Sequence, residues 1–203
     1  LAASWGVLLF GTTLAAQLPE KPNIIFILAD DLGFGDTGIY NQNARHGQGL
    51  PHIETPRIDQ MAAGGMRFTN MYACGPECSP TRGGLITGFH TGHATIRSNG
   101  GYLRREDITV PEVLKRAGYA TALIGKWGIG TVSAQTSPEQ KGFDLGYGYL
   151  DNVHAWEHYT NYLYRNGVTE SIPENDGAPG ACNQEVVFTQ DLFTAEALDF
   201  IQL

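Results

Sequence analysis

The chain has 203 residues, enough for one large domain or two small ones, and its 42% hydrophobic and 17% charged residues are typical of a folded globular protein. The formal net charge of -8 argues against a nucleic-acid backbone as the main partner, because that contact normally needs a surplus of Lys and Arg. Three cysteines (Cys74, Cys78 and Cys182) are too few for a disulfide scaffold, and their odd number leaves at least one thiol for another role.

Residues 1–21 are predicted to be the remnant of a signal peptide and a linker. The run LAASWGVLLFGTTLAAQLPEK is apolar, reaches small residues at Ala15 and Ala16, and then becomes polar. A buried helix or a membrane anchor is the alternative, but the run is too short and too interrupted by glycine for a stable membrane span. Since no Met or basic segment precedes it, we expect the chain to begin partway through the precursor of an exported protein.

The first predicted strand is IIFILAD, residues 24–30, whose continuous apolar run is typical of a strand buried on both faces of a parallel sheet. It leads into Asp30 and Asp31. Adjacent carboxylates repel each other unless a cation or several donors stabilise them, and oxygen ligands suit calcium or magnesium. A solvated turn that favours aspartate is the alternative.

The remaining predicted elements alternate between helix and strand. They are a helix from Thr55 to Gly64 and Gly65, a short strand at 67–73, a helix that starts near Pro80, a helix at 109–118 capped by Thr109, a buried strand at 120–128 and an amphipathic helix at 189–203. Residues 142–167 are aromatic-rich and are expected to be irregular. The alternation predicts an α/β fold with a doubly wound, mostly parallel sheet. Because the last helix has no terminator, we expect this sheet to be incomplete at its C-terminal end.

The stretch CSPTRGGLITG, residues 78–88, places Arg82 about one helical turn after Cys78 if Pro80 starts a helix. A guanidinium is always charged and binds an oxyanion through a planar fork, so the pair suits a nucleophile that faces a sulfate or phosphate group. A Cys74–Cys78 disulfide and a surface arginine are the alternatives, and a zinc site is disfavoured because CGPEC lacks a second matching pair. Lys126 lies at a strand end, where its ammonium could interact with a leaving group or with negative charge that develops during a reaction. The alternative is an ordinary surface lysine.

Together these motifs resemble the type I, formylglycine-dependent sulfatase family, whose fold is like that of alkaline phosphatase. CSPTRGGLITG fits the family pattern C-x-P-x-R-x-x-L-x-T-G through Cys78, Pro80, Arg82, Leu85, Thr87 and Gly88. GYATALIGKW (118–127) is similar to the second family signature, and PNIIFILADDLGFGD (22–36) is similar to the opening strand and metal loop. Residues 22–203 would form the N-terminal part of an arylsulfatase-like catalytic domain.

The resemblance implies that a separate formylglycine-generating enzyme oxidises Cys78 in the extended chain to an aldehyde, which hydrates to a diol. One hydroxyl would attack the sulfur of a sulfate ester, and the other would help to expel inorganic sulfate. Asp30, Asp31 and residue 78 would bind calcium, with magnesium less favoured. Arg82 would orient the diol, and Lys126 would contact the sulfate or the leaving oxygen.

The chain departs from the family at Gly128, where a histidine usually follows Lys-Trp. His154, in DNVHAWEHY, lies where related sequences carry polar groups on the sulfate side, and it is a further candidate for substrate binding. The family supplies more metal ligands, a histidine and a lysine from beyond the position of Leu203. The resemblance therefore implies that this chain alone binds calcium weakly and is inactive.

The expected function is hydrolysis of sulfate esters, with a sulfated carbohydrate as one candidate substrate. One alternative is a phosphate-ester hydrolase of the same fold, although those enzymes generally use Ser or Thr where Cys78 stands. The other is a non-catalytic chain in which Cys78 is unmodified. We expect no nucleic-acid partner, no stable membrane span, and a protein exported to the periplasm, the secretory pathway or the extracellular space.

Overall fold

The computed structural model describes residues 21–90, 92–175, 177–178, 181–182 and 185–202. The chain divides into two units, residues 1–66 and residues 67–203. The predicted signal-peptide remnant lies outside the described residues, apart from Lys21. In the described part of the chain, no helix has the length and apolar character that crossing a membrane requires.

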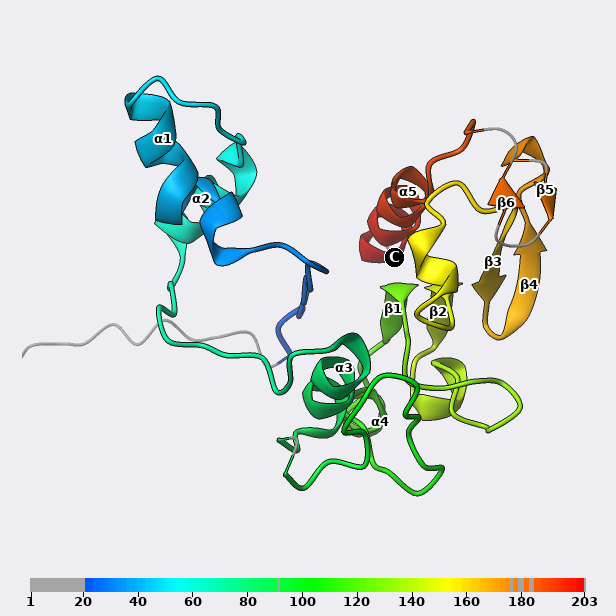
Figure 1. The fold of residues 1–203 in the computed structure, drawn as a ribbon. Coiled ribbons are helices and arrows are strands. Elements are labelled where there is room, and N and C mark those ends of the chain that lie inside the picture. Colours follow the sequence, from blue (N-terminus) through cyan, green and yellow to red (C-terminus); the bar gives the residue numbers. More distant parts are fainter. Residues whose placement is uncertain (1–20, 91, 176, 179–180, 183–184, 203) are drawn as a thin grey trace, which may run out of the picture. The chain divides into compact units, whose positions relative to one another are not determined.

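Short helices are the regular secondary structure of the first unit within its described residues. They are η1 (Phe34–Asp36), η2 (Gly38–Gln42), α1 (Asn43–Gly47) and α2 (Pro56–Gly64), as Figure 1 shows. The predicted helix at 55–64 is confirmed as α2, which has Pro56 in its first turn. Its start is tied to η2, because the Gly38 amide donates to Thr55 Oγ1 at 2.7 Å and the Ile39 amide donates to Asp59 Oδ1 at 3.1 Å.

The prediction of a strand at residues 24–30 is wrong. The segment is neither helix nor strand, and Ile25 and Ile27 are 64% and 77% exposed. A strand persists only where a neighbour takes its backbone hydrogen bonds, and none of the described strands pairs with this segment. The predicted short strand at 67–73 is wrong for the same reason, since its residues are also exposed and unpaired with any described strand.

The second unit is built around a four-stranded sheet with the order β1-β2-β3-β4 (Figure 1). The strands are β1 (Ala122–Lys126), β2 (Leu145–Tyr149), β3 (Tyr162–Arg165) and β4 (Val168–Ser171), and a small second sheet pairs β5 (Gly177–Ala178) with β6 (Ala181–Cys182). β1 and β2 are parallel, whereas β2, β3 and β4 pair antiparallel. The α/β class is confirmed, and the aromatic-rich stretch expected to be irregular forms β2 and β3.

The parallel pair depends on a close approach between two glycines. Gly125 and Gly148 are partners in the register of β1 and β2, and Gly148 has a φ of +139°. A Cβ built on Gly148 would lie 2.0 Å from the carbonyl oxygen of Gly125. Only glycine fits at this point of the sheet.

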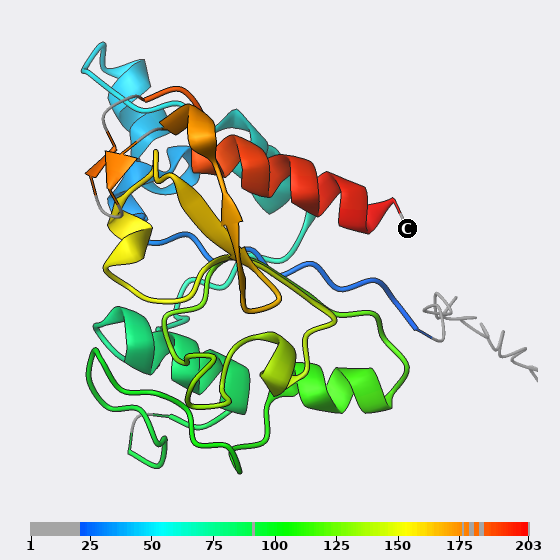
Figure 2. The same ribbon diagram turned by 90° about the vertical axis from the view of Figure 1, so that its right-hand side faces the viewer.

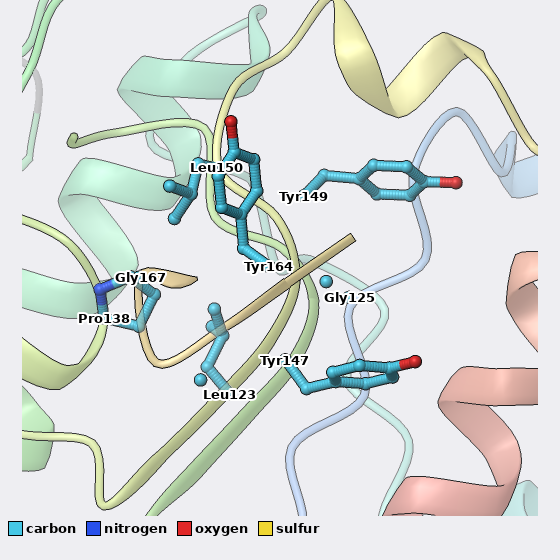
Figure 3. A pocket seen from close by; sticks show the side chains of 10 residues that line it. Leu123, Gly125, Pro138, Tyr147, Tyr149, Leu150, Tyr164 and Gly167 are labelled. Carbon is cyan, nitrogen blue, oxygen red and sulfur yellow. The ribbon is translucent and has the colours of Figure 1, made fainter. Parts of the chain in front are cut away.

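Side chains alternate between two hydrophobic clusters, one on each face of the sheet. Tyr147 and Tyr149 of β2 extend to the same side, away from Leu123 and Pro138 (Figure 3). The pocket drawn there has a volume of about 10 Å³, room for one water molecule. It is a packing gap in the core rather than a substrate site.

Three longer helices surround this sheet. They are α3 (Cys78–Thr87), α4 (Val110–Arg116) and α5 (Thr189–Ile201), and single 3-10 turns occur at η3 (Glu139–Lys141), η4 (His154–Trp156) and η5 (Pro173–Asn175). α5 packs on β1 and β2, and both views place α3 and α4 on the opposite side of these strands (Figures 1 and 2). Phe193 of α5 contacts the rings of Tyr147 and Tyr149, with centroids 6.0 and 5.4 Å apart.

The start of α4 and the end of α5 differ in how well neighbouring groups satisfy them. The predicted capping of α4 is confirmed, because the Glu112 carboxylate accepts from the Thr109 amide at 2.8 Å and the chain turns at Gly118 with a φ of +81°. In α5, Leu198 and Ile201 are 54% and 56% exposed, although their spacing predicts the apolar face. The described part of the chain leaves this end of α5 uncovered.

Candidate functional site

Cys78 is the first residue of α3 and is half-buried, and Arg82 follows one turn later on the same helix. Pro80 lies in the first turn, where its missing N–H costs no helical hydrogen bond. The buried glycines after Arg82 have a packing reason. A Cβ on Gly84 would lie 2.6 Å from Cys74 Sγ, so the glycine lets the helix pack against the loop that precedes it.

Lys126, at the end of β1, reaches the start of α3. Its Nζ donates to Cys78 Sγ at 3.2 Å, and Arg82 Nη1 donates to the carbonyl oxygen of Lys126 at 2.5 Å. The structure therefore brings together three predicted site residues that lie up to 48 positions apart in sequence. We call Cys78, Arg82 and Lys126 the Cys78 cluster. Two cationic side chains meet here on a chain of formal net charge -8, so the cluster suits an anionic ligand.

Two polar residues that sequence analysis did not single out hold this cluster in place. Ser79 is fully buried, and its hydroxyl donates to the carbonyl oxygen of Gly128 at 2.9 Å. Asn152, after β2, donates from Nδ2 to Ser79 Oγ at 2.9 Å. These bonds join the start of α3 to the segments that follow β1 and β2. No sequence signal could have found Asn152, since its role depends on a contact across 73 residues.

The departure from the family pattern at Gly128 has a structural basis. Gly128 has a φ of +71°, and a Cβ at this position would lie 2.4 Å from Asn152 Oδ1. A histidine in this backbone conformation would be strained and would displace Asn152. Asn152 Oδ1 is buried without a hydrogen-bond partner among the described residues. The side chain of Asn152 therefore occupies the space that a side chain at position 128 would need, which explains the glycine there.

His154 lies in η4 and is buried among aromatic side chains. Its Nε2 shares a hydrogen bond with Thr160 Oγ1 at 2.9 Å, and its ring stacks on Tyr162 with centroids 4.2 Å apart. Its Nδ1 is buried and has no hydrogen-bond partner among the described residues, so neither ring nitrogen bonds to the Cys78 cluster. Burial lowers the pKa of His154 below its ordinary value of 6.5, and the nearby Asp151 carboxylate only partly opposes this effect.

This lowered pKa predicts a loss of stability in mild acid. A histidine whose folded-state pKa is depressed favours folding fully above its unfolded value of about 6.5, and this contribution is lost as the pH falls through the folded-state pKa. We expect the free energy of unfolding to decrease from pH 7 to pH 5, and to decrease less in His154→Gln. Urea denaturation at both pH values measures this, with the exposed His158→Gln as control. An unchanged pH dependence in His154→Gln would contradict the expectation.

The predicted metal ligands Asp30 and Asp31 belong to the first unit. Both are exposed, and Asp31 has a φ of +57°, which is uncommon for a residue other than glycine. The loop after them is closed by Asp36, whose carboxylate accepts from the Gly33 amide at 3.0 Å. The donor set consists of carboxylate oxygens, which fits calcium. Calcium takes about six to eight oxygen ligands, so these two residues would supply only part of such a site.

Comparison with known proteins shows the family of the chain. The sulfatase family model matches residues 22–201. The chain belongs to the sulfatase family. N-acetylgalactosamine-6-sulfatase of Mus musculus is 37% identical over 213 residues, which cover 93% of this chain and 38% of the relative. The chain thus spans well under half the length of that curated relative.

Two solved structures are similar to this chain in fold. The PsFucS1 sulfatase from Pseudoalteromonas sp. has a TM-score of 0.63 at 26% identity, covering 86% of this chain and 39% of that one. The structure of BT4656 in complex with its substrate D-glucosamine-2-N,6-O-disulfate has a TM-score of 0.59 at 26% identity, covering 79% and 28%. The predicted alkaline-phosphatase-like α/β architecture of sulfatases is therefore confirmed for this chain.

Proposed function

We propose that this chain is part of an enzyme that hydrolyses sulfate esters, using formylglycine formed from Cys78 and a bound calcium ion. The observation that carries this proposal is the Cys78 cluster: the ammonium of Lys126 lies 3.2 Å from the sulfur of the one cysteine that stands within the full sulfatase signature. A formylglycine at position 78 supplies a hydrated aldehyde with two hydroxyl groups. One hydroxyl can attack the sulfur of the ester, and the other can help to expel inorganic sulfate.

We assign a role to Lys126 and Arg82 of the Cys78 cluster, and a supporting role to the neighbouring Ser79. Lys126 donates hydrogen bonds to oxygen atoms at position 78 and to the sulfate or the leaving oxygen, where negative charge develops. Arg82 binds the carbonyl oxygen of Lys126, so it fixes the ammonium relative to position 78 and orients the diol. Ser79, through its buried hydrogen bond to Gly128, keeps α3 and the end of β1 in register.

Asp30, Asp31 and the oxygen at position 78 are the proposed calcium ligands. A bound calcium ion would stabilise negative charge on the reacting oxygens. His154 is retained as a residue on the substrate side, and the neutral form that its burial favours suits a hydrogen-bonding rather than a charge-pairing role.

The proposed substrate is a sulfated carbohydrate. The relative named above is called a sulfatase of N-acetylgalactosamine 6-sulfate groups, and BT4656 is bound to a sulfated glucosamine. We also propose that the protein is exported and that a formylglycine-generating enzyme acts on it before folding. The apolar run at 1–21 and the signature at 78–88 support these two points.

Mass spectrometry of the tryptic peptide Phe68–Arg82 tests the proposal, because it reads the modification without requiring activity. In a host that has the modifying enzyme, we expect conversion of Cys78 to lower the peptide mass by about 18 Da. Cys74 lies in the same peptide and serves as an internal control, since it should remain an alkylatable thiol. Cys78→Ala should abolish the mass change, whereas Cys74→Ala should keep it.

An unmodified thiol at position 78 in such a host would contradict the proposal. That result would favour the non-catalytic alternative, or a hydrolase that does not depend on formylglycine.

A further inference from the structure

Two histidines and a glutamate meet where α1 ends and the next loop begins: His46 is in the last turn of α1, and His52 and Glu54 are in the loop that follows it. His46 Nδ1 lies 2.7 Å from His52 Nε2, and Glu54 Oε1 lies 3.7 Å from the same His52 nitrogen. One ligand atom from each of the three residues lies within 4.8 Å of the other two. Among the described residues, this is the one group of three or more His, Cys, Asp or Glu side chains that meets this distance.

A backbone contact fixes which nitrogen of His52 is available. His52 Nδ1 lies 3.1 Å from the carbonyl oxygen of Leu50, which can only accept, so Nδ1 carries the proton. The lone pair is therefore on Nε2, which faces His46 and Glu54. A carbonyl that holds the second imidazole nitrogen in this way is the usual partner of a metal-binding histidine.

The segment from the end of α1 to Glu54, which carries these residues, is held in shape independently of the three side chains. Arg45 Nε donates to the carbonyl oxygen of Pro51 at 2.8 Å, and the Leu50 amide donates to the Arg45 carbonyl at 3.0 Å. On the far side of the loop, the Ile53 amide donates to Gln42 Oε1 at 2.9 Å. These contacts keep positions 46, 52 and 54 close together before any ligand binds, which lowers the entropic cost of binding.

We propose that His46, His52 and Glu54 form a binding site for zinc or a similar transition-metal ion. Two imidazole nitrogens and one carboxylate oxygen suit zinc, whereas calcium prefers oxygen ligands alone. With metal–nitrogen bonds of about 2.0–2.1 Å, the two ligand nitrogens of a tetrahedral site lie about 3.3 Å apart. The distance between His46 Nδ1 and His52 Nε2, now 2.7 Å, must therefore increase by about 0.6 Å. Rotation of the exposed His46 ring provides this change.

Metal binding requires a change in the position of one proton, on His46. Without metal, His46 Nδ1–H donates to His52 Nε2, because Leu50 fixes the proton of His52 on the other nitrogen. On binding, His46 becomes the Nε2–H tautomer by exchange with water, and both facing lone pairs coordinate the metal. Water takes the fourth position, so the site has three protein ligands and one open position.

A second histidine pair in the chain provides a matched control. His93 Nδ1 lies 2.9 Å from His90 Nε2, and the two rings meet edge to face much as those of His46 and His52 do. No third ligand joins this pair within the part of the chain that the structure describes. If two neighbouring imidazoles were enough to bind zinc, both histidine pairs should therefore bind it.

Calorimetric titration of the chain with zinc, in the presence of excess calcium, tests the proposal. We expect His46→Gln/His52→Gln to lose one equivalent of bound zinc and His90→Gln/His93→Gln to retain it. Glu54→Gln should weaken the affinity by about tenfold. Because the Glu54 side chain is 77% exposed, its replacement tests the site even if the double variant fails to fold.

Cobalt substitution separates this site from the cysteines, which also bind zinc. All variants keep the three cysteines, and a site of two nitrogens and one oxygen gives cobalt d–d absorption without thiolate charge-transfer bands. Loss of such absorption in the double variant supports the proposal. Equal zinc stoichiometry and affinity in the native chain and in both His46/His52 and Glu54 variants would overturn it, whatever the outcome for sulfate-ester hydrolysis.

Discussion

Replacing Lys126 by methionine is expected to lower kcat/KM for a sulfate ester by about 10²–10³-fold, the usual cost of removing a donor that stabilises developing negative charge. The ammonium of Lys126 lies 3.2 Å from the atom at position 78 where the proposed chemistry occurs. Methionine keeps the length of the side chain but removes its charge and its donors. Steady-state kinetics with a preparation of the protein that turns over a sulfate ester measures the effect.

Lys115→Met is the matched control. Lys115 lies on α4, is half exposed, and its ammonium pairs with Asp144 at 2.6 Å rather than with Cys78. We expect its replacement to change kcat/KM by less than about twofold, as for a surface substitution away from any site. A Lys126→Met enzyme within threefold of the native rate would rule out the proposed role of Lys126, provided that formylglycine is present at position 78.

Replacing Trp127 by alanine is expected to lower the free energy of unfolding by about 3–5 kcal/mol, the range for removing a large buried aromatic side chain. Trp127 is 1% exposed and packs edge to face on Phe143 with centroids 6.0 Å apart. It also donates from Nε1 to the carbonyl oxygen of Thr136 at 2.9 Å. The cavity would open directly beside Lys126, so the same variant should also impair the site. Urea denaturation followed by circular dichroism measures the loss.

Trp127→Phe separates packing from the hydrogen bond. Phenylalanine keeps much of the aromatic volume but leaves the Thr136 carbonyl without its donor, which costs about 1–3 kcal/mol for a buried acceptor. We therefore expect the free energy of unfolding of Trp127→Phe to lie between that of the native chain and that of Trp127→Ala. If alanine cost less than about 1 kcal/mol, Trp127 would not be the core residue that its burial indicates.

The parts of the fold that sequence predicted correctly depend on local chemistry. The start of α4 follows from Thr109 and Glu112, which satisfy free amide groups of one helical turn, and α2 begins at a proline. Predictions that needed a distant partner were less successful. Residues 24–30 have the composition of a buried strand but remain exposed, because backbone pairing depends on which strands are present as neighbours.

The aromatic-rich stretch gives the opposite case. Residues 145–149, LGYGY, contain two glycines and suggest irregular structure, yet they form the buried strand β2. The glycines are required by the close approach of Gly148 to Gly125 and not by a turn. That reason becomes visible only once β1 and β2 are aligned.

By itself, the sequence determined the family and the candidate site residues at Cys78 and Arg82, because the signature around Cys78 is a continuous stretch whose residue types and spacing can be read without a fold. Only the tertiary structure decided that Lys126 meets Cys78, that Asn152 leaves room for no side chain at Gly128, and that the side chains of His46, His52 and Glu54 come together. Each of these contacts depends on how chain segments are placed in space. Side-chain chemistry is encoded locally, whereas distances between side chains are set by the packing of the whole unit that holds them.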